Sequence, residues 1–132
     1  MDLSTLQGEQ SGFLHLEHPA TREPLYEDGK PVGFHTASRF SKEWRQKSAE
    51  LANLRMNRKK KSTAERQFHE TNELFASLIK SVDNLAAPTG EGTSEKVTPK
   101  NVSQLVFANE RLSWVREQFD EYLGDDAGFF TS

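Results

Sequence analysis

Apolar and polar residues alternate near the N-terminus, whereas over the rest of the chain apolar residues recur at helical spacing. Alternation with a period of two is typical of a strand with one buried face. The pair Asp28-Gly29 lies between two alternating stretches and predicts a tight turn, since glycine tolerates positive φ. We therefore predict a small antiparallel sheet, a β-hairpin region over residues 12–36, after a flexible N-terminus at residues 1–11. The residues that share a face within each stretch are Leu14 and Leu16, then Val32, Phe34 and Thr36.

The central part of the chain, residues 36–87, contains no Gly or Pro, as is typical of helical structure. Apolar residues at helical spacing predict helices over about 40–58 and 63–86. A capping box at residues 62–65 marks the start of the second helix. The spacing leaves open whether residues 40–86 form two helices or one long rod. Trp44 lies on the apolar stripe of the first helix, so we expect it in the core.

The last third of the chain begins with a polar stretch at residues 87–98, which lacks periodicity and predicts a loop. Residues 99–124 predict further helix in one or two pieces, because Asn109 is a good N-cap for a separate helix. A tail at residues 125–132 follows. The predicted fold class is α+β, mainly α with a small N-terminal antiparallel β-sheet and three to four helices. These elements form a single domain over residues 12–132.

The segment from Asn109 to Phe130 holds more large apolar side chains than one helix face can bury. Trp114 lies about 100° around the helix from Val115, away from most of the apolar stripe. Gly124 is placed to stop the helix in a left-handed turn. Surplus apolar surface near a chain end predicts contact with a partner, although burial of Trp114 or of the terminal phenylalanines in the chain's own core is the alternative. The residues predicted to bind a partner are Leu112, Trp114, Val115, Phe119, Tyr122, Phe129 and Phe130.

Hydrophobic residues make up 34% of the 132-residue chain, below the roughly 45–50% typical of globular proteins. A core this lean often depends on neighbouring subunits, which favours a homo-oligomer. The absence of cysteine excludes disulfides and thiolate chemistry. No apolar stretch approaches the roughly 20 residues of a membrane span. No signal-peptide pattern opens the chain, so we expect a soluble intracellular protein without a membrane partner.

Charge is unevenly distributed along the chain, whose net charge is −3. Residues 39–66 hold ten Lys or Arg against three Asp or Glu, whereas residues 103–132 hold two against six. Opposite charge in the two regions favours head-to-tail contact between copies. The basic run at residues 55–61 also fits contact with an acidic protein or with nucleic acid, although no nucleic-acid-binding motif accompanies it. The charged residues predicted to direct self-association are Arg55, Arg58, Lys59, Lys60, Lys61, Glu117, Glu121 and Asp125.

The sequence predicts no catalytic or metal site. His15, His18 and His35 lie near one another in the predicted sheet, but residues 15 and 18 of one strand point to opposite faces. We therefore interpret the histidines as structural or surface residues. Motifs for nucleotide binding and for a nucleophilic serine are absent from the sequence. We expect a protein that is not an enzyme and that uses no cofactor or metal ion.

Two segments taken together resemble one protein family. Residues 13–46 read FLHLEHPATREPLYEDGKPVGFHTASRFSKEWRQ, in which HPAT, EPL and DGKPV precede a serine and an aromatic-plus-arginine helix start. Residues 111–130 read RLSWVREQFDEYLGDDAGFF. In this order they are similar to the opening and the ending of tail assembly chaperones from phages with long, non-contractile tails. Arg22 stands where the family usually has Gly, and Asp126 stands where a basic residue is common.

The resemblance implies a non-enzymatic chaperone of virion assembly. Such proteins bind the tape measure protein, keep it soluble during tail assembly and are displaced by tail tube subunits, which are transient partners. They are late proteins of the host cell cytoplasm, are not part of the mature virion, and in many phages also occur as a longer form made by ribosomal frameshifting. The alternatives are a small nucleic-acid-binding or regulatory protein that uses residues 55–61, and a head–tail joining or tail-completion protein.

Overall fold

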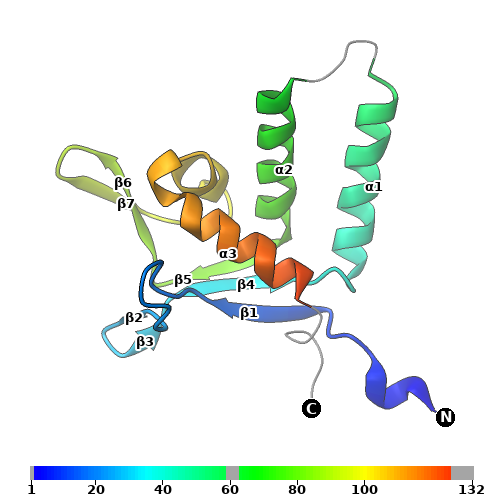
Figure 1. Cartoon of the computed structure of the whole chain (residues 1–132), viewed down its shortest axis with the longest axis horizontal. Coiled ribbons are helices and arrows are strands. Elements are labelled where there is room, and N and C mark those ends of the chain that lie inside the picture. Colours follow the sequence, from blue (N-terminus) through cyan, green and yellow to red (C-terminus); the bar gives the residue numbers. More distant parts are fainter. Residues whose placement is uncertain (1, 59–62, 126–132) are drawn as a thin grey trace.

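The computed structural model describes residues 2–58 and 63–125, which form helices packed on one side of a small sheet (Figure 1). The predicted contact residues that lie outside the described part are Lys59, Lys60, Lys61, Phe129 and Phe130. In chain order, the elements are η1 (Leu3–Leu6), β1 (Ser11–His15), β2 (Tyr26–Glu27), β3 (Lys30–Pro31), β4 (Gly33–Ala37), α1 (Lys42–Met56), α2 (Ala64–Leu78), β5 (Ile79–Asp83), β6 (Ala86–Gly90), β7 (Thr93–Lys96), η2 (Ser103–Phe107), η3 (Glu110–Leu112) and α3 (Ser113–Gly124).

The main sheet is antiparallel and has the order β1-β4-β5, with β4 in the centre. Phe34 on β4 pairs with Leu14 on β1 and with Val82 on β5, and its side chain is fully buried. Gly33 has no room for a side chain, because a Cβ there would lie 1.9 Å from the Leu14 carbonyl oxygen. The predicted N-terminal sheet is confirmed in part, since residues 12–36 supply two of its strands but the third is β5.

The third strand corrects a predicted helix. The prediction of helix over 63–86 is wrong beyond Leu78, where α2 ends and β5 begins. Ile79 and Val82 continue the helical spacing of α2, which explains the error. They lie on a strand paired with β4, and the Thr36 hydroxyl donates a hydrogen bond to the Leu78 carbonyl at 3.2 Å. Pairing with β4 satisfies the backbone of both strands and outweighs the local preference for helix.

Two short hairpins extend from the sheet (Figure 1). In β2–β3, Gly29 has a φ of 77°, which confirms the predicted Asp-Gly turn. In β6–β7, Gly92 has a φ of 73° between the paired strands, so the prediction of a loop over 87–98 is wrong. Only Ala87 and Val97 at the base of this hairpin are buried. The alternation of apolar residues is therefore too weak for the sequence to indicate strands there.

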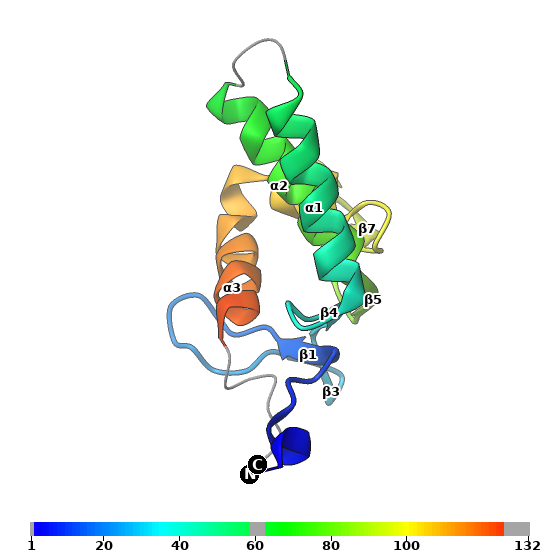
Figure 2. The ribbon, with the colours of Figure 1, turned by 90° about the vertical axis from the view of Figure 1, so that its right-hand side faces the viewer.

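The helices α1 and α2 are separate and run antiparallel, so residues 40–86 contain two helices and no single rod (Figures 1 and 2). We call this pair the α1–α2 hairpin, and it projects away from the sheet. Ser41 Oγ accepts a hydrogen bond from the Trp44 amide, and Thr63 Oγ1 accepts one from the Arg66 amide, each at 3.1 Å. These bonds cap the start of each helix. Trp44 is half-buried and packs against the core, near its expected position.

The third helix, α3, lies across the sheet and closes the core (Figure 1). Gln118 ties it to the chain after β1, because its Nε2 donates to the Glu17 carbonyl at 2.8 Å and its Oε1 accepts from the Glu17 amide at 2.9 Å. Aromatic rings from β4, α2, η2 and α3 itself meet between α3 and the sheet, with neighbouring centroids 5.2–6.4 Å apart. The rings belong to Phe34, Phe75, Phe107 and Phe119.

The region predicted as helix over 99–124 contains three pieces, the π-helix η2, the 3₁₀-helix η3 and α3. Asn109 Oδ1 accepts a hydrogen bond from the Arg111 amide at 3.0 Å, so a separate helical segment does start there. Gly124 is the last residue of α3, but its φ is not positive, so the predicted left-handed turn is wrong. With small antiparallel sheets and more helical than strand residues, the α+β class is confirmed.

Candidate partner-binding site

The apolar stripe of α3 covers the chain's own sheet. Val115 is 2% exposed and Phe119 is 0% exposed, and both belong to the core. The prediction that they bind a partner is therefore wrong in this fold. The physical reason is that the sheet needs a cover for Phe34, and α3 provides it. The sequence shows that the stripe is buried but not whether a partner or its own domain buries it.

Three other predicted contact residues occupy the margin of the core. Leu112, Trp114 and Tyr122 are half-buried and pack against the core cluster. Burial raises the pKa of the Tyr122 phenol, and the negative charge of Asp125 raises it further. These side chains offer a partner only their outer edges, so α3 is not the most accessible apolar surface of the described residues.

Two cations of the basic run act within the chain. Arg58 forms a bidentate hydrogen-bonded ion pair with Glu70, and both side chains are largely buried. Arg55 Nε lies 3.7 Å from the same carboxylate, and its Nη2 donates to the Gln67 carbonyl at 3.4 Å. The hydrogen bond from Arg58 lowers the pKa of Glu70, and the positive charges nearby lower it further. Arg55 and Arg58 therefore help hold α1 against α2. Arg58 is largely buried in this pair, against its predicted role in self-association, whereas for the more exposed Arg55 that role stays a prediction.

Of the predicted acidic counterparts, Glu117 and Glu121 are exposed on α3 and Asp125 is exposed directly after it. Glu121 Oε2 lies 3.6 Å from Arg22 Nη2, so its charge is shared within the chain. Arg22, which stands where the resembled family usually has Gly, has a φ of 62° and also contacts Glu17 at 3.2 Å. Glu117 and Asp125 are exposed, as the predicted surface role requires.

An uncovered apolar surface lies on α1, where no residue is buried. Leu54 is 54% exposed and Met56 is 81% exposed. A groove of about 460 Å³ runs between α1 and α2 and has Leu51, Leu54 and Leu74 in its lining, whereas Met56 lies about 160° around the helix from Leu54 and outside the groove. We call it the hairpin groove. Its polar lining consists of Lys47, Glu50, Glu70, Glu73 and Ser77.

Sequence reasoning missed this groove because it assigned the apolar stripe of α1 to the core. The signal that was present is the composition of α1, in which charged residues surround a narrow apolar stripe. A helix of that kind can lie on the outside of a domain with only one edge covered. An apolar stripe that the chain leaves open is a candidate surface for a partner.

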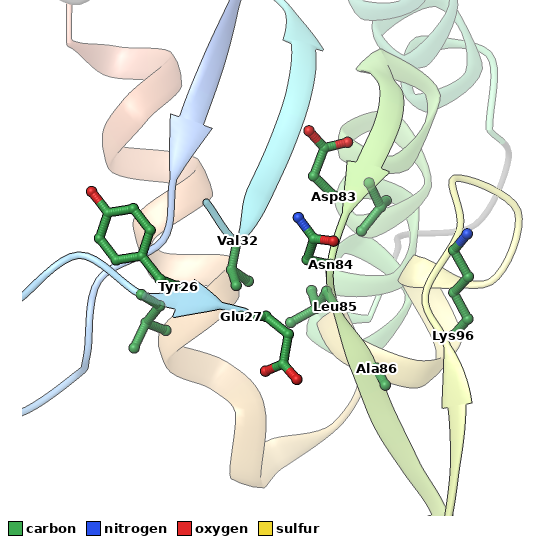
Figure 3. A pocket seen from close by; sticks show the side chains of 10 residues that line it. Tyr26, Glu27, Val32, Asp83, Asn84, Leu85, Ala86 and Lys96 are labelled. Atoms are coloured by element: carbon green, nitrogen blue, oxygen red, sulfur yellow. The ribbon is translucent and has the colours of Figure 1, made fainter. Parts of the chain in front are cut away.

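A second concave region lies where the two strand hairpins meet the end of β5 (Figure 3). Its volume is about 680 Å³, and Figure 3 shows Tyr26 on one side and Lys96 on the other. Asn84 Nδ2 donates to the Pro31 carbonyl at 3.0 Å, which links its two sides. Asp83 is engaged by His35 at 3.1 Å. Asn84 and Asp83 are thus engaged within the fold, and among residues 2–58 and 63–125 no group of three or more His, Cys, Asp or Glu is placed to hold a metal ion.

Within the described ranges, none of the helices has both the length and the apolar character needed to cross a membrane. Comparison of the chain with protein-family models, with curated proteins and with solved structures finds no match. The hairpin groove is therefore assigned on its own geometry: an open apolar stripe with a charged border, on two helices that project from the body of the protein (Figure 2).

Proposed function

We propose that this chain is a non-enzymatic chaperone that binds the tape measure protein of a phage tail through the hairpin groove. The observation that carries the proposal is that α1 buries none of its residues, while Leu54 in the lining of the groove is 54% exposed. The two terminal segments that resemble tail assembly chaperones support the choice of client. The groove takes over the binding role that the sequence assigned to α3.

The groove suits a helical client. An amphipathic helix binds a groove of this kind by placing residues at i, i+3, i+4 and i+7 against its apolar floor. The tape measure protein is a long, apolar, helical chain whose surface would aggregate until the tail tube encloses it. A shallow groove with a charged border gives modest affinity, because the area that the client buries there is small and few contacts are formed in advance. Modest affinity allows many copies to cover the client and tail tube subunits to displace them.

The proposal places the chain in the host cytoplasm during tail assembly and outside the finished virion. Several copies coat one client, so self-association accompanies binding. Nucleic-acid binding is the less favoured function, because Arg55 and Arg58 of the basic run are engaged by Glu70. A joining or tail-completion role has no observation in its favour beyond the small size of the chain.

Co-expression with the tape measure protein of the same phage tests the proposal. The double variant Leu51→Asp/Leu54→Asp places charge in the groove, and neither leucine is buried. We expect wild type to keep the tape measure protein soluble and to co-purify with it. In the variant, soluble client should fall about tenfold, because charged groups resist burial against an apolar helix.

The matched control is Leu3→Asp/Leu6→Asp, since these leucines of η1 are 65% and 56% exposed and lie outside the groove. The control should retain client binding. If wild-type protein neither rescues nor co-purifies with the tape measure protein, the proposed function is wrong. Retention of the chain in purified virions would instead indicate a joining or tail-completion protein.

A further inference from the structure

The two walls of the hairpin groove have the same residue spacing. On α1 the lining residues fall at i, i+3, i+4 and i+7 from Lys47 to Leu54, and on α2 they fall at the same positions from Glu70 to Ser77. Each set forms one stripe along its helix, because residues three and four apart are neighbours on a helix surface. At 1.5 Å per residue, each stripe covers about two turns and is about 10 Å long.

The two stripes lie level with each other. Arg55 Nε lies 3.7 Å from the Glu70 carboxylate, which also pairs with Arg58, so the tip of α1 is beside Glu70. Since α1 and α2 run antiparallel, the Lys47 end of one stripe lies beside the Ser77 end of the other (Figure 2). Two aligned stripes with an open seam leave room for a third helix that packs along both, as in a helical bundle.

The charged groups at the border of the groove already interact within the fold. Lys47 Nζ lies 3.7 Å from Glu50 Oε2, and the Ser103 hydroxyl donates a hydrogen bond to Glu73 Oε1 at 2.9 Å. The three leucines of the lining therefore provide most of what the groove offers a ligand, which is apolar contact. A ligand is selected by the pattern of its apolar residues more than by its charge.

The groove is too small to hold a stable dimer by itself. Four residues from each helix line it, whereas a specific, stable interface uses about 20–30 residues on each side. A second copy held only through this groove would dissociate readily. A long client differs, because it engages many copies along its length, each through a weak contact.

We infer that each hairpin groove holds about two turns of a client helix, roughly eight residues, as a third helix alongside α1 and α2. The inference rests on the proposed function and defines its substrate class. The segments that bind are those in which an apolar stripe continues for about two helical turns. A longer stripe offers a site to another copy but does not bind one copy more tightly.

Fluorescently labelled designed peptides and the full-length protein test the footprint. The peptides have the same length, about 20 residues, and carry leucine stripes of one, two or three turns. Glutamine fills the other stripe positions, because its helix propensity is close to that of leucine. Fluorescence anisotropy measures the affinity. We expect a gain of about tenfold from one turn to two, as more leucine surface is buried, and of less than about threefold from two turns to three.

Two further peptides test the helical geometry. One has a single alanine inserted at the centre of the two-turn stripe, which rotates its halves by about 100° relative to each other. It should bind about tenfold more weakly, because only one half can face the groove. The control has the alanine inserted beyond the stripe and should keep its affinity within about twofold. Circular dichroism checks that the two peptides are equally helical.

Variants of the protein test whether the peptide contacts both walls. Leu51→Asp/Leu54→Asp changes the α1 wall and Leu74→Gln changes the α2 wall. Each should weaken binding of the two-turn peptide by about tenfold, since a polar group then faces the apolar stripe. Leu3→Asp/Leu6→Asp lies outside the groove and should bind as wild type does. Thermal unfolding checks that each variant is folded.

The failures are distinguishable. If affinity rises about tenfold again from two turns to three, if the central insertion has no effect, or if folded Leu74→Gln binds as wild type does, the inference is wrong. The proposed function would still stand where Leu51→Asp/Leu54→Asp loses the tape measure protein in co-expression. Failure of every peptide to bind also overturns the inference, and co-expression then decides the proposed function. A change in the oligomeric state of the protein alone in Leu51→Asp/Leu54→Asp, measured by sedimentation, would assign the groove to a second copy and contradict both.

Discussion

Glu70 is the residue whose environment most affects the geometry of the α1–α2 hairpin. Its carboxylate receives the paired hydrogen bonds of Arg58 from the other helix, and Arg55 lies close by. Neither contact could be read from the sequence, because the partners are 12 residues apart or more and lie on different helices. The sequence shows a basic run and nearby acidic residues, but it does not show which of the cations forms an ion pair within the chain.

The pH dependence of stability tests this ion pair. The folded-state pKa of Glu70 lies below 4.5, the ordinary value for a glutamate. A depressed pKa contributes stability that is fully present above the unfolded-state value and is lost as pH falls through the folded-state value. We therefore expect the difference in unfolding free energy between wild type and Glu70→Gln to be constant from pH 7 to about pH 5 and to shrink below pH 4.5. Urea titrations at a series of pH values measure it, and a difference that stays constant down to pH 3 would contradict the role of the ionised pair.

At the scale of elements, the sequence predicted the strands and helices in which the spacing of apolar residues agrees with how the element packs. The alternation around Leu14 and Phe34 identified β1 and β4, and the Asp-Gly pair identified the turn of β2–β3. β5 was missed because Ile79 and Val82 fit a helix as well as a strand. The β6–β7 hairpin was missed because only its base is buried. Long-range strand pairing, which decides both cases, leaves little trace in a local pattern.

The same limit applies to the candidate site. The sequence identified α3 as apolar on one face but could not tell a partner from the chain's own sheet. It identified the stripe of α1 but assigned it to the core, since apolar spacing is the same for a covered and an open helix. The choice between the two helices depends on which of them packs over Phe34, and that is a property of the tertiary fold.

The packing of α3 predicts a large loss of stability on truncation of its central residue. Phe119 is fully buried and contacts the rings of Phe34, Phe75 and Phe107. Phe119→Ala should lower the free energy of unfolding by about 3–5 kcal/mol, because it removes an aromatic ring and leaves a cavity. Urea denaturation followed by circular dichroism measures the change. Leu54→Ala on the exposed face of α1 is the control and should change stability by less than about 1 kcal/mol. Similar small losses for both would mean that α3 does not close the core.

The molecule as a whole consists of a compact body and a projecting helical pair (Figures 1 and 2). Four phenylalanine rings are buried between α3 and the rest of the core, while the α1–α2 hairpin leaves an apolar groove open. Stability and binding therefore depend on different residues, because the exposed groove residues can be substituted without disturbing the packing of the core. This arrangement fits a protein that covers a client repeatedly and is then displaced.

Site-specific photo-crosslinking tests the central claim most directly. A photoreactive phenylalanine analogue at Leu54, which is 54% exposed and lines the hairpin groove, should crosslink to co-expressed tape measure protein. The same analogue at Leu3, which is 65% exposed on η1, should not. Mass spectrometry of the crosslinked client then identifies the bound segment. Crosslinks from Leu54 without any from Leu3 would establish the α1–α2 hairpin as the client site, whereas crosslinks from Leu3 or Trp114 in the absence of any from Leu54 would contradict it.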